Sequence, residues 1–316
     1  MLKKKHKIYI AGHKGLVGNA VLSKLKKNNY KNLLLADKKK LNLLDIVKLK
    51  NFFKKNKPDV LIICAAKVGG ILENKNFQLD FLLENLQIQT NLLTCAKEFK
   101  VKRTIFLGSS CIYPKFCKTP IKEEYLMSGK LEKTNESYAL SKIIGLKMSS
   151  ILVNDFDQDI VCIMPTNLYG VNDNFDIKSS HVIPGLITKF LISKETNTPV
   201  KVWGSGKSIR EFLFVDDLAD AIFKLLKCSK KKLTKASLNK VPVFNVGSGE
   251  SVTIKSLVLK IKNIIKFKGK IIFDTNYPDG TLNKNLDSKK IYSLNWRPKT
   301  KLDEGLRLVI KSRNKN

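Results

Sequence analysis

The first half of the chain alternates short apolar runs with longer segments of helical periodicity. The apolar runs that are typical of strands are residues 7–11, 32–36, 59–65, 104–107 and 160–164. The segments with helical spacing between them are residues 15–27, 45–55, 77–99 and 137–154. Runs with almost no polar position, such as DVLIICA, are usually strands that a parallel sheet buries on both faces. This order predicts an α/β fold with a doubly wound parallel sheet and right-handed crossovers.

The second half has a looser pattern. Its expected helices begin after residue 181 and at residues 216 and 253, and its expected strands are residues 200–203 and 241–246. We expect the lysine-rich stretch at 229–240 to be an exposed connection and the terminal KSRNKN to be disordered. The pattern predicts a first domain at residues 1–172 and a smaller α/β lobe at residues 173–316, with segments near 212–250 that return to the first domain.

The charge of the chain does not by itself indicate a nucleic-acid partner. The net charge is +32 over 316 residues, but only five of the 59 basic residues are arginine, and the lysines are scattered along the whole chain. Proteins that read specific nucleic-acid sequences favour arginine and interleave aromatic side chains with a basic stripe. We therefore ascribe the lysines to a compositional bias of the source proteome. Loose polyanion binding, or attraction of an anionic substrate, is the alternative.

Neither a membrane segment nor a metal site is indicated. The basic N-terminus MLKKKHKIYIAG has only a few apolar residues before Gly12, and no apolar run approaches the roughly 18 residues that a membrane span needs. The six cysteines have no C-x-x-C spacing and no histidine cluster nearby. We expect a cytoplasmic protein without a membrane partner, without a bound metal and without a disulfide framework.

A glycine-rich turn joins the first strand to the first helix. Gly12, Gly15 and Gly18 are spaced G-x-x-G-x-x-G. Glycine permits the tight turn, lets backbone N–H groups approach a pyrophosphate and allows the helix to pack closely on the strand. A glycine turn at this position predicts a dinucleotide site.

The residues after the second strand bear on the choice between NAD and NADP. Asp37 ends that strand, where an acidic side chain binds ribose hydroxyls and favours NAD. Lys38, Lys39 and Lys40 follow directly, and Lys14 lies in the glycine turn. Cations at these positions favour the 2′-phosphate of NADP. We expect NADP as the cofactor, with NAD as the alternative.

Three residues downstream form a pattern suited to carbonyl chemistry. Ser109 follows an apolar strand, and Tyr138 and Lys142 lie one turn apart on a predicted helix, on the same face. The lysine ammonium is expected to lower the pKa of the tyrosine from about 10 and to hold the nicotinamide ribose. Tyr138 then serves as the acid or base, and Ser109 hydrogen-bonds the substrate oxygen.

Cys111, two residues after the serine, indicates a second proton-transfer task. His181, one of only three histidines, precedes a predicted helix at the expected cleft between the lobes. A thiol with a pKa of about 8.5 and an imidazole with a pKa of about 6.5 can remove and return protons on carbons beside a ketone. An inert thiol is the alternative for Cys111.

Several longer stretches resemble one family over nearly the full chain. They are YIAGHKGLVG, LNLLD, AAKVGGI, LGSSCIYPK, TNESYALSK, MPTNLYG, SHVIPGLI, VWGSGKSIREFLFVDDLA and FDTNYPDGT. The chain resembles the GDP-L-fucose synthase family of extended short-chain dehydrogenases/reductases. The resemblance implies a Rossmann-type NADP-binding domain, a lobe that binds a GDP-sugar, and a homodimer. It also implies NADPH-dependent conversion of GDP-4-keto-6-deoxy-D-mannose to GDP-L-fucose by epimerisation at carbons 3 and 5 and reduction at carbon 4.

The resemblance also assigns roles to individual residues. Ser109, Tyr138 and Lys142 are implied in the reduction, and Cys111 and His181 are implied as the base and acid of epimerisation. The residues implied in cofactor binding are Gly12, His13, Lys14, Gly15, Leu16, Val17, Gly18, Asp37, Lys38, Leu107, Gly108, Ser109, Ser110, Lys142, Pro165, Thr166, Asn167, Leu168 and His181. The residues implied in holding the GDP moiety are Lys189, Trp203, Arg210 and Asp279.

Two other functions compete with this one. The first is reduction, with or without epimerisation, of another GDP-4-keto-deoxy sugar such as a dideoxyhexose or a deoxyheptose in surface-polysaccharide synthesis. A sugar 4-epimerase is less favoured because it needs no cysteine–histidine pair. The second is a non-catalytic nicotinamide- or polyanion-binding protein, against which the intact Ser-Tyr-Lys trio argues.

Overall fold

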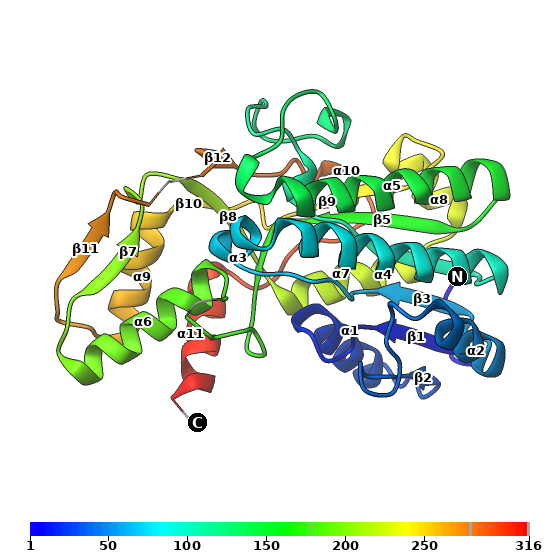
Figure 1. The fold of residues 1–316 in the computed structure, drawn as a ribbon, viewed down its shortest axis with the longest axis horizontal. Coiled ribbons are helices and arrows are strands. Elements are labelled where there is room, and N and C mark those ends of the chain that lie inside the picture. Colours follow the sequence, from blue (N-terminus) through cyan, green and yellow to red (C-terminus); the bar gives the residue numbers. More distant parts are fainter. Residues whose placement is uncertain (178, 278–279, 315–316) are drawn as a thin grey trace.

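The larger part of the molecule is built on one six-stranded parallel sheet. The computed structural model describes residues 1–177, 179–277 and 280–314, without the side chains of Ile71 and Leu72. The strand order is β2-β1-β3-β4-β5-β9. The bounds are β1 Ile8–Ala11, β2 Leu33–Leu34, β3 Val60–Ile63, β4 Arg103–Leu107, β5 Ile160–Pro165 and β9 Val243–Val246. The predicted doubly wound α/β fold is confirmed (Figure 1).

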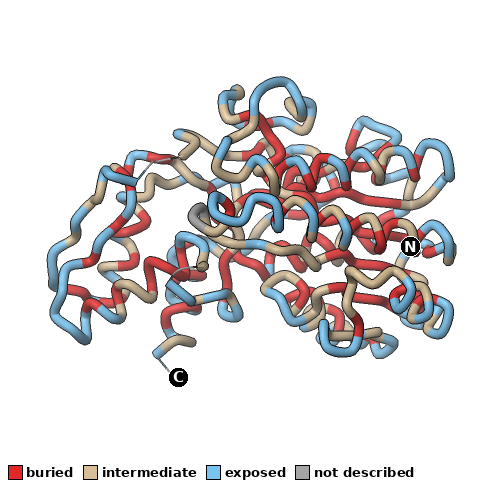
Figure 2. Tube along the Cα trace, in the orientation of Figure 1, coloured by how far each residue is buried: buried red, intermediate tan, exposed pale blue. Residues whose placement is uncertain are grey.

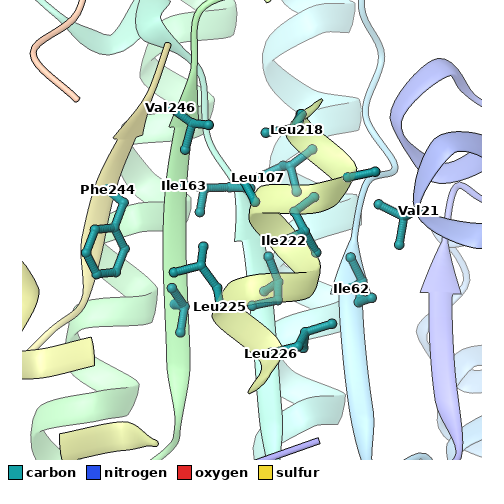
Figure 3. Packing of buried hydrophobic residues seen from close by; sticks show 14 of the residues in the cluster. Val21, Ile62, Leu107, Ile163, Leu218, Ile222, Leu225, Leu226, Phe244 and Val246 are labelled. Carbon is teal, nitrogen blue, oxygen red and sulfur yellow. The ribbon is translucent and has the colours of Figure 1, made fainter. Parts of the chain in front are cut away.

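Helices cover both faces of this sheet. Their bounds are α1 Leu16–Lys27, α2 Ile46–Asn56, α4 Gln78–Glu98, α5 Glu136–Phe156 and α7 Val215–Lys227, and the short α3, Ile71–Asn76, contacts α4. Alternate strand residues face opposite sides, so Ile8 and Ile10 pack with α1 and α7, whereas Tyr9 packs with α2 and α4. Figure 3 shows Leu218 and Ile222 of α7 against the sheet. Each such fully buried side chain contributes roughly 1.5–3 kcal/mol of transfer free energy.

The second lobe contains two small sheets and three longer helices. One sheet has the order β10-β8-β12 with β6 beside β8, and the other pairs β11 with β7. The strand bounds are β6 Asn167–Tyr169, β7 Val200–Trp203, β8 Ile209–Phe214, β10 Ser251–Thr253, β11 Ile271–Asp274 and β12 Asn283–Lys284. The helix bounds are α6 Val182–Thr196, α9 Ile254–Ile265 and α11 Leu302–Arg313. Buried residues of these elements, red in Figure 2, form one apolar cluster.

The chain crosses between the two lobes more than once. Although α7 and β9 come after β7 and β8 in the sequence, they lie in the layers of the six-stranded sheet (Figure 1). The division at residues 172 and 173 stays a prediction. No helix in the described ranges is both long enough and apolar enough to span a membrane.

The predicted exposed connection at residues 229–240 is wrong, because it contains the helix α8, Lys230–Ser237. Ser229 begins the helix by accepting a hydrogen bond from the backbone N–H of Lys232. Leu233 is fully buried and Ala236 packs partly buried on the same core, so two apolar side chains anchor a helix whose other face is charged. The first residues of the terminal KSRNKN belong to α11, and residues 315–316 lie outside the described ranges. The remaining short helices are α10, Lys289–Tyr292, and the single turns Ser110–Ile112 after β4, Glu123–Tyr125 and Lys133–Asn135.

Candidate active site

The predicted cofactor and catalytic residues converge at the carboxyl ends of the parallel strands. The glycine turn follows β1, Ser109 and Cys111 follow β4, and residues 165–168 end β5 and begin β6. The connections from β1 lead to β2 on one side and then to β3 on the other, so β1 lies at the point where the strand order reverses. Open α/β sheets bind ligands at this point.

Two of the three glycines in the turn are required by the packing of the chain itself. Gly12 has φ +85°, and a Cβ there would lie 2.7 Å from the backbone nitrogen of Ala65. A Cβ at Gly18 would lie 2.1 Å from the carbonyl oxygen of Gly12. These contacts hold the first turn of α1, which includes Leu16 and Val17, directly over the end of β1.

Gly15 has no such packing requirement. A Cβ at this position would meet only the Gly12 carbonyl oxygen at 3.5 Å, an ordinary contact. The residue is exposed and begins α1, where unpaired N–H groups and the helix dipole favour an anion. Nδ1 of His13 is buried in the same turn without a hydrogen-bond partner among the described residues. Gly15 therefore leaves the N-terminus of α1 open to an anion, and the unpaired His13 nitrogen lies beside it. This arrangement fits a dinucleotide pyrophosphate.

Asp37 lies three residues after the end of β2, not at the end of the strand as predicted, and the Lys14 ammonium forms an ion pair with it at 2.9 Å. The backbone N–H of Lys40 also donates to Asp37, at 3.1 Å. The hydrogen bonds from Lys14 and then from Lys40 lower the pKa of the Asp37 carboxyl. Lys38 is exposed beside them. The acid that favours NAD is therefore already engaged by a cation from the glycine turn.

The other predicted cofactor residues line the ends of β4 and β5. Leu107 ends β4, Gly108 follows it, and Ser110 is buried in the next turn. The Thr166 hydroxyl and the Asn167 amide both donate to the backbone carbonyl of Glu211, at 3.0 and 2.9 Å. These bonds attach the segment that begins at Pro165 and ends with Leu168 to β8.

The structure brings the Ser-Tyr-Lys trio together. The Ser109 hydroxyl lies close enough to the phenol of Tyr138 to affect its pKa, and its Oγ accepts from the backbone N–H of Cys111 at 3.1 Å. Lys142 is buried and donates from Nζ to the carbonyl oxygen of Leu107 at 3.0 Å. Its Nζ lies 5.9 Å from the centroid of the Tyr138 ring. The predicted one-turn spacing of Tyr138 and Lys142 on α5 is thus reproduced.

The expected effect of the lysine on the tyrosine is wrong in this structure. Burial raises the pKa of Tyr138, the nearby Cys111 raises it further, and the hydrogen bond from Ser109 offsets only part of this. Burial lowers the pKa of Lys142 to about 8. The lysine is directed at the Leu107 carbonyl instead of the phenol. The phenol is therefore protonated at neutral pH, which suits a proton donor.

Cys111 lies in a polar environment unlike that of the core cysteines. Its Sγ accepts hydrogen bonds from Nδ2 of Asn135 and from Nζ of Lys284, both at 3.3 Å. Burial alone would raise the pKa of the thiol, but Lys284, Ser109 and the charge of Arg210 outweigh burial and lower it. By contrast, burial raises the pKa of the remaining strand and helix cysteines Cys64, Cys95 and Cys162 to about 12. These contacts favour a reactive thiol over an inert one.

His181 begins α6 and keeps exposed surface. The carbonyl of Ser179, two residues earlier, accepts a hydrogen bond from the backbone N–H of Gly70 at 3.1 Å, so this segment lies against the loop after β3. Partial desolvation lowers the pKa of the imidazole. The hydrogen bonds described for Cys111 go to Asn135 and Lys284, so its pairing with His181 stays a prediction.

Two of the predicted substrate residues meet in the second lobe. Nζ of Lys189 lies 4.4 Å from the centroid of the Trp203 ring. Trp203 is 38% exposed and stacks on Tyr277, with ring centroids 4.7 Å apart, so it is not a core residue. Arg210 donates to the Thr281 carbonyl at 2.5 Å and is close enough to Cys111 to affect its pKa. Asp279 lies outside the described residues.

Comparisons with known proteins agree with this geometry. The model of the NAD dependent epimerase/dehydratase family matches residues 8–247. The chain belongs to this family. Putative GDP-L-fucose synthase 2 of Arabidopsis thaliana is 47% identical over 97% of this chain and 91% of its own length. GDP-L-fucose synthase of Escherichia coli (strain K12) is 40% identical over 96% of this chain and 94% of its own length.

A solved structure of a related GDP-sugar enzyme has the same fold. MlghC, a GDP-mannoheptose C4 reductase from Campylobacter jejuni with NADP bound, is 33% identical to this chain. It superposes with a TM-score of 0.89, covering 99% of this chain and 100% of that chain. The motif-based resemblance to the GDP-L-fucose synthase family is confirmed by the curated relatives.

For this member of the epimerase/dehydratase family, sequence reasoning missed three residues of the site. Lys284 carried no signal, because it is one lysine among many in a lysine-rich chain. Asn135 lies in the quoted stretch TNESYALSK, and its place one turn before Tyr138 could have revealed it. Glu211, next to Arg210, is fully buried and accepts from the backbone N–H groups of Gly249 and Leu286 at 2.7 and 2.8 Å. Glu211 lies in the quoted stretch VWGSGKSIREF, so its place beside Arg210 in that motif could have revealed it.

Proposed function

We propose that this protein converts GDP-4-keto-6-deoxy-D-mannose to GDP-L-fucose with NADPH, by epimerisation at carbons 3 and 5 and reduction at carbon 4. The observation that carries the proposal is a thiol held by two hydrogen-bond donors beside a Ser-Tyr-Lys trio. A plain dehydrogenase needs the trio only. The curated relatives at 47% and 40% identity, which are named for this synthesis, support the choice of sugar.

Each group in the site has a place in this reaction. The carbon-4 ketone acidifies the protons on carbons 3 and 5, and Cys111, whose pKa is lowered, removes a proton there. His181 returns a proton to the sugar. Ser109 and Tyr138 donate hydrogen bonds to the carbon-4 oxygen, where negative charge develops in both stages. Bound NADPH supplies the hydride for the reduction. Tyr138 then gives its proton to the same oxygen.

The cofactor residues support NADP in preference to NAD. The glycine turn leaves the N-terminus of α1 open to the pyrophosphate, as Gly15 shows. Lys14 holds the Asp37 carboxylate in an ion pair, which reduces the repulsion that this acid exerts on a 2′-phosphate. Lys38 adds a second exposed cation. Both lysines act as point charges, without the planar fork of arginine.

The function is tested by turnover of GDP-4-keto-6-deoxy-D-mannose in deuterated water, with NADPH and NADH compared in parallel. We expect GDP-L-fucose with deuterium at carbons 3 and 5 and a higher kcat/KM for NADPH. Mass spectrometry and NMR of the product measure both labels. Reduction without label would instead favour a carbon-4 reductase of another GDP-sugar, the activity named for the Campylobacter jejuni structure. Cofactor binding without turnover of any GDP-keto sugar would favour a non-catalytic protein.

We propose further that the protein is a homodimer formed through α4 and α5. These two long helices pack on each other, and Gly145 permits the close approach, since a Cβ there would lie 2.6 Å from Oε1 of Gln89. Their outer faces expose Leu83 and Leu140 at 54% and 40%, and Ile144 at 41%. Apolar residues repeated at helical spacing on adjacent helices fit a self-complementary interface.

The double substitution Leu83→Glu and Ile144→Glu is expected to convert the dimer to a monomer, because each copy would then bury unpaired carboxylates in the interface. Light scattering coupled to size-exclusion chromatography measures the mass. Leu259→Glu is the matched control, since Leu259 is 45% exposed but lies on α9 of the other lobe. A wild-type protein of monomer mass would contradict the proposal.

A cytoplasmic location belongs to the same proposal. All six cysteines are free thiols, as is usual in reducing compartments. Fractionation that recovers the protein with membranes or in an oxidising compartment would contradict it.

A further inference from the structure

A lysine from the second lobe reaches the reactive thiol of the first. Lys284 lies on β12, 173 residues after Cys111, and its Nζ lies 3.3 Å from Sγ. Asn135, just before α5, places its amide nitrogen at the same distance from this sulfur. The sulfur therefore accepts from one charged donor and one neutral donor, which come from two different lobes.

The position of Lys284 is set by its neighbours on both sides. It pairs in register with Arg210 of the parallel strand β8, so the two side chains leave the sheet on the same face. Two residues on, the backbone N–H of Leu286 donates to the buried Glu211 carboxylate at 2.8 Å. The carbonyl of Asn285, between them, accepts from the backbone N–H of Ile121 at 2.8 Å. These bonds hold the backbone that carries Lys284 within reach of the sulfur.

We propose that Lys284 is a positioning residue that stabilises the thiolate form of Cys111 before the sugar binds, while Asn135 directs the sulfur. The proposal deepens the proposed function, because the thiol is the base that this function requires. An ammonium at this distance stabilises the thiolate over the thiol, and the amide N–H favours the same form. Lys284 therefore acts through Cys111 and not on the sugar.

The direction in which the pKa of Cys111 shifts follows from all the groups that face its sulfur. Burial raises the pKa of Cys111, whereas Lys284 from β12, Ser109 beside it and Arg210 from β8 lower it, with a net lowering. From α5, Tyr138 faces the sulfur as a neutral phenol, because its own pKa is raised. Lys284 also faces Cys117, but burial still raises the pKa of that thiol. Without Lys284, burial would be opposed by Ser109, Arg210 and the Asn135 amide but by no ammonium in contact with the sulfur, so the thiolate would form at higher pH.

The test is the pH dependence of Cys111 alkylation by iodoacetamide in the full-length protein. Trypsin releases Cys111 in the peptide 104–115, separate from Cys117, so mass spectrometry follows this thiol alone. In Lys284→Met we expect the midpoint of the rate profile to move up by at least about one pH unit, which slows alkylation about tenfold near neutral pH. Lys284→Arg should keep a midpoint close to that of the wild type, because it retains the charge.

Two further variants make the result specific. Lys289→Met, which removes an exposed lysine from the same segment, should leave the profile unchanged. Asn135→Asp, which puts a carboxylate beside the sulfur, should raise the midpoint even if Lys284→Met folds poorly by circular dichroism. An unchanged midpoint in folded Lys284→Met, or in Asn135→Asp, would overturn the proposal.

Deuterium exchange into the sugar provides a second measurement. Lys284→Met should lose exchange at neutral pH and recover it as the pH is raised, because hydroxide then forms the thiolate. An equal loss at every pH would mean a purely structural role and would overturn the proposal. The alkylation result does not depend on the sugar. A wild-type protein that fails to convert GDP-4-keto-6-deoxy-D-mannose would therefore contradict the proposed function and leave the role of Lys284 standing.

Discussion

Cys111→Ser is expected to lower deuterium incorporation at carbons 3 and 5 about 10²- to 10⁴-fold, the usual contribution of a general base. A serine hydroxyl can still accept from Asn135 and Lys284, so the geometry around position 111 should be preserved. It cannot ionise near neutral pH, however, and so cannot remove a proton from carbon. The measurement is mass spectrometry of the sugar after incubation in deuterated water.

The control for this prediction is Cys117→Ser. Cys117 is also partly buried and also faces Lys284, but burial raises the pKa of its thiol. This variant should exchange deuterium at the wild-type rate. NADPH binding, followed by fluorescence, should be retained in both variants because neither residue belongs to the glycine turn. Normal exchange in Cys111→Ser would show that the thiol is structural.

Tyr138→Phe is expected to lower the rate of NADPH oxidation about 10²- to 10⁴-fold, since it removes the proton donor to the carbon-4 oxygen. Burial keeps the phenol protonated at neutral pH, so no other change in ionisation accompanies the substitution. The ring keeps its edge contact with Phe81, at a centroid distance of 6.5 Å. Deuterium exchange should fall less, because Ser109 still donates to the same oxygen. Stopped-flow absorbance of NADPH measures the reduction, and mass spectrometry of the sugar measures the exchange, so the two effects are separated.

Tyr125→Phe is the matched control, because Tyr125 is also partly buried but lies in the loop between Cys111 and α5. Its rate of NADPH oxidation should equal that of the wild type. Equal losses of exchange and reduction in Tyr138→Phe would show that the phenol serves only to bind the sugar. Wild-type reduction by this variant would remove Tyr138 from the proposed mechanism altogether.

The buried strands of the first domain could be predicted closely from the chain alone. Residues 7–11 and 59–65 were expected as strands, and β1 and β3 lie within them. Such strands are apolar on both faces, a local pattern that survives in any tertiary context. The prediction was wrong where few residues carry the packing. Leu233 and Ala236 anchor α8 within a lysine-rich stretch, and two apolar residues in eight leave no clear periodicity to detect.

The residues of the catalytic site were also predicted only in part. Ser109, Cys111, Tyr138 and Lys142 were expected because they come from two nearby segments with characteristic spacing. Lys284 was not expected, because β12 has only two residues and is defined by its pairing with β8. The raised pKa of Tyr138 was not expected either, since burial and the direction of the Lys142 ammonium depend on neighbours distant in sequence.

The sequence by itself therefore determined the parallel sheet, the glycine turn for a dinucleotide and the trio with its adjacent thiol. Each of these features depends on residues close together along the chain, so their spacing and their position after a strand can be recognised in the sequence. Only the tertiary structure decided the ionisation of that thiol, because its pKa depends on Lys284 and Arg210 from the second lobe. Electrostatic interactions depend on distance in space, and no pattern in a lysine-rich sequence shows which single lysine lies 3.3 Å from a sulfur.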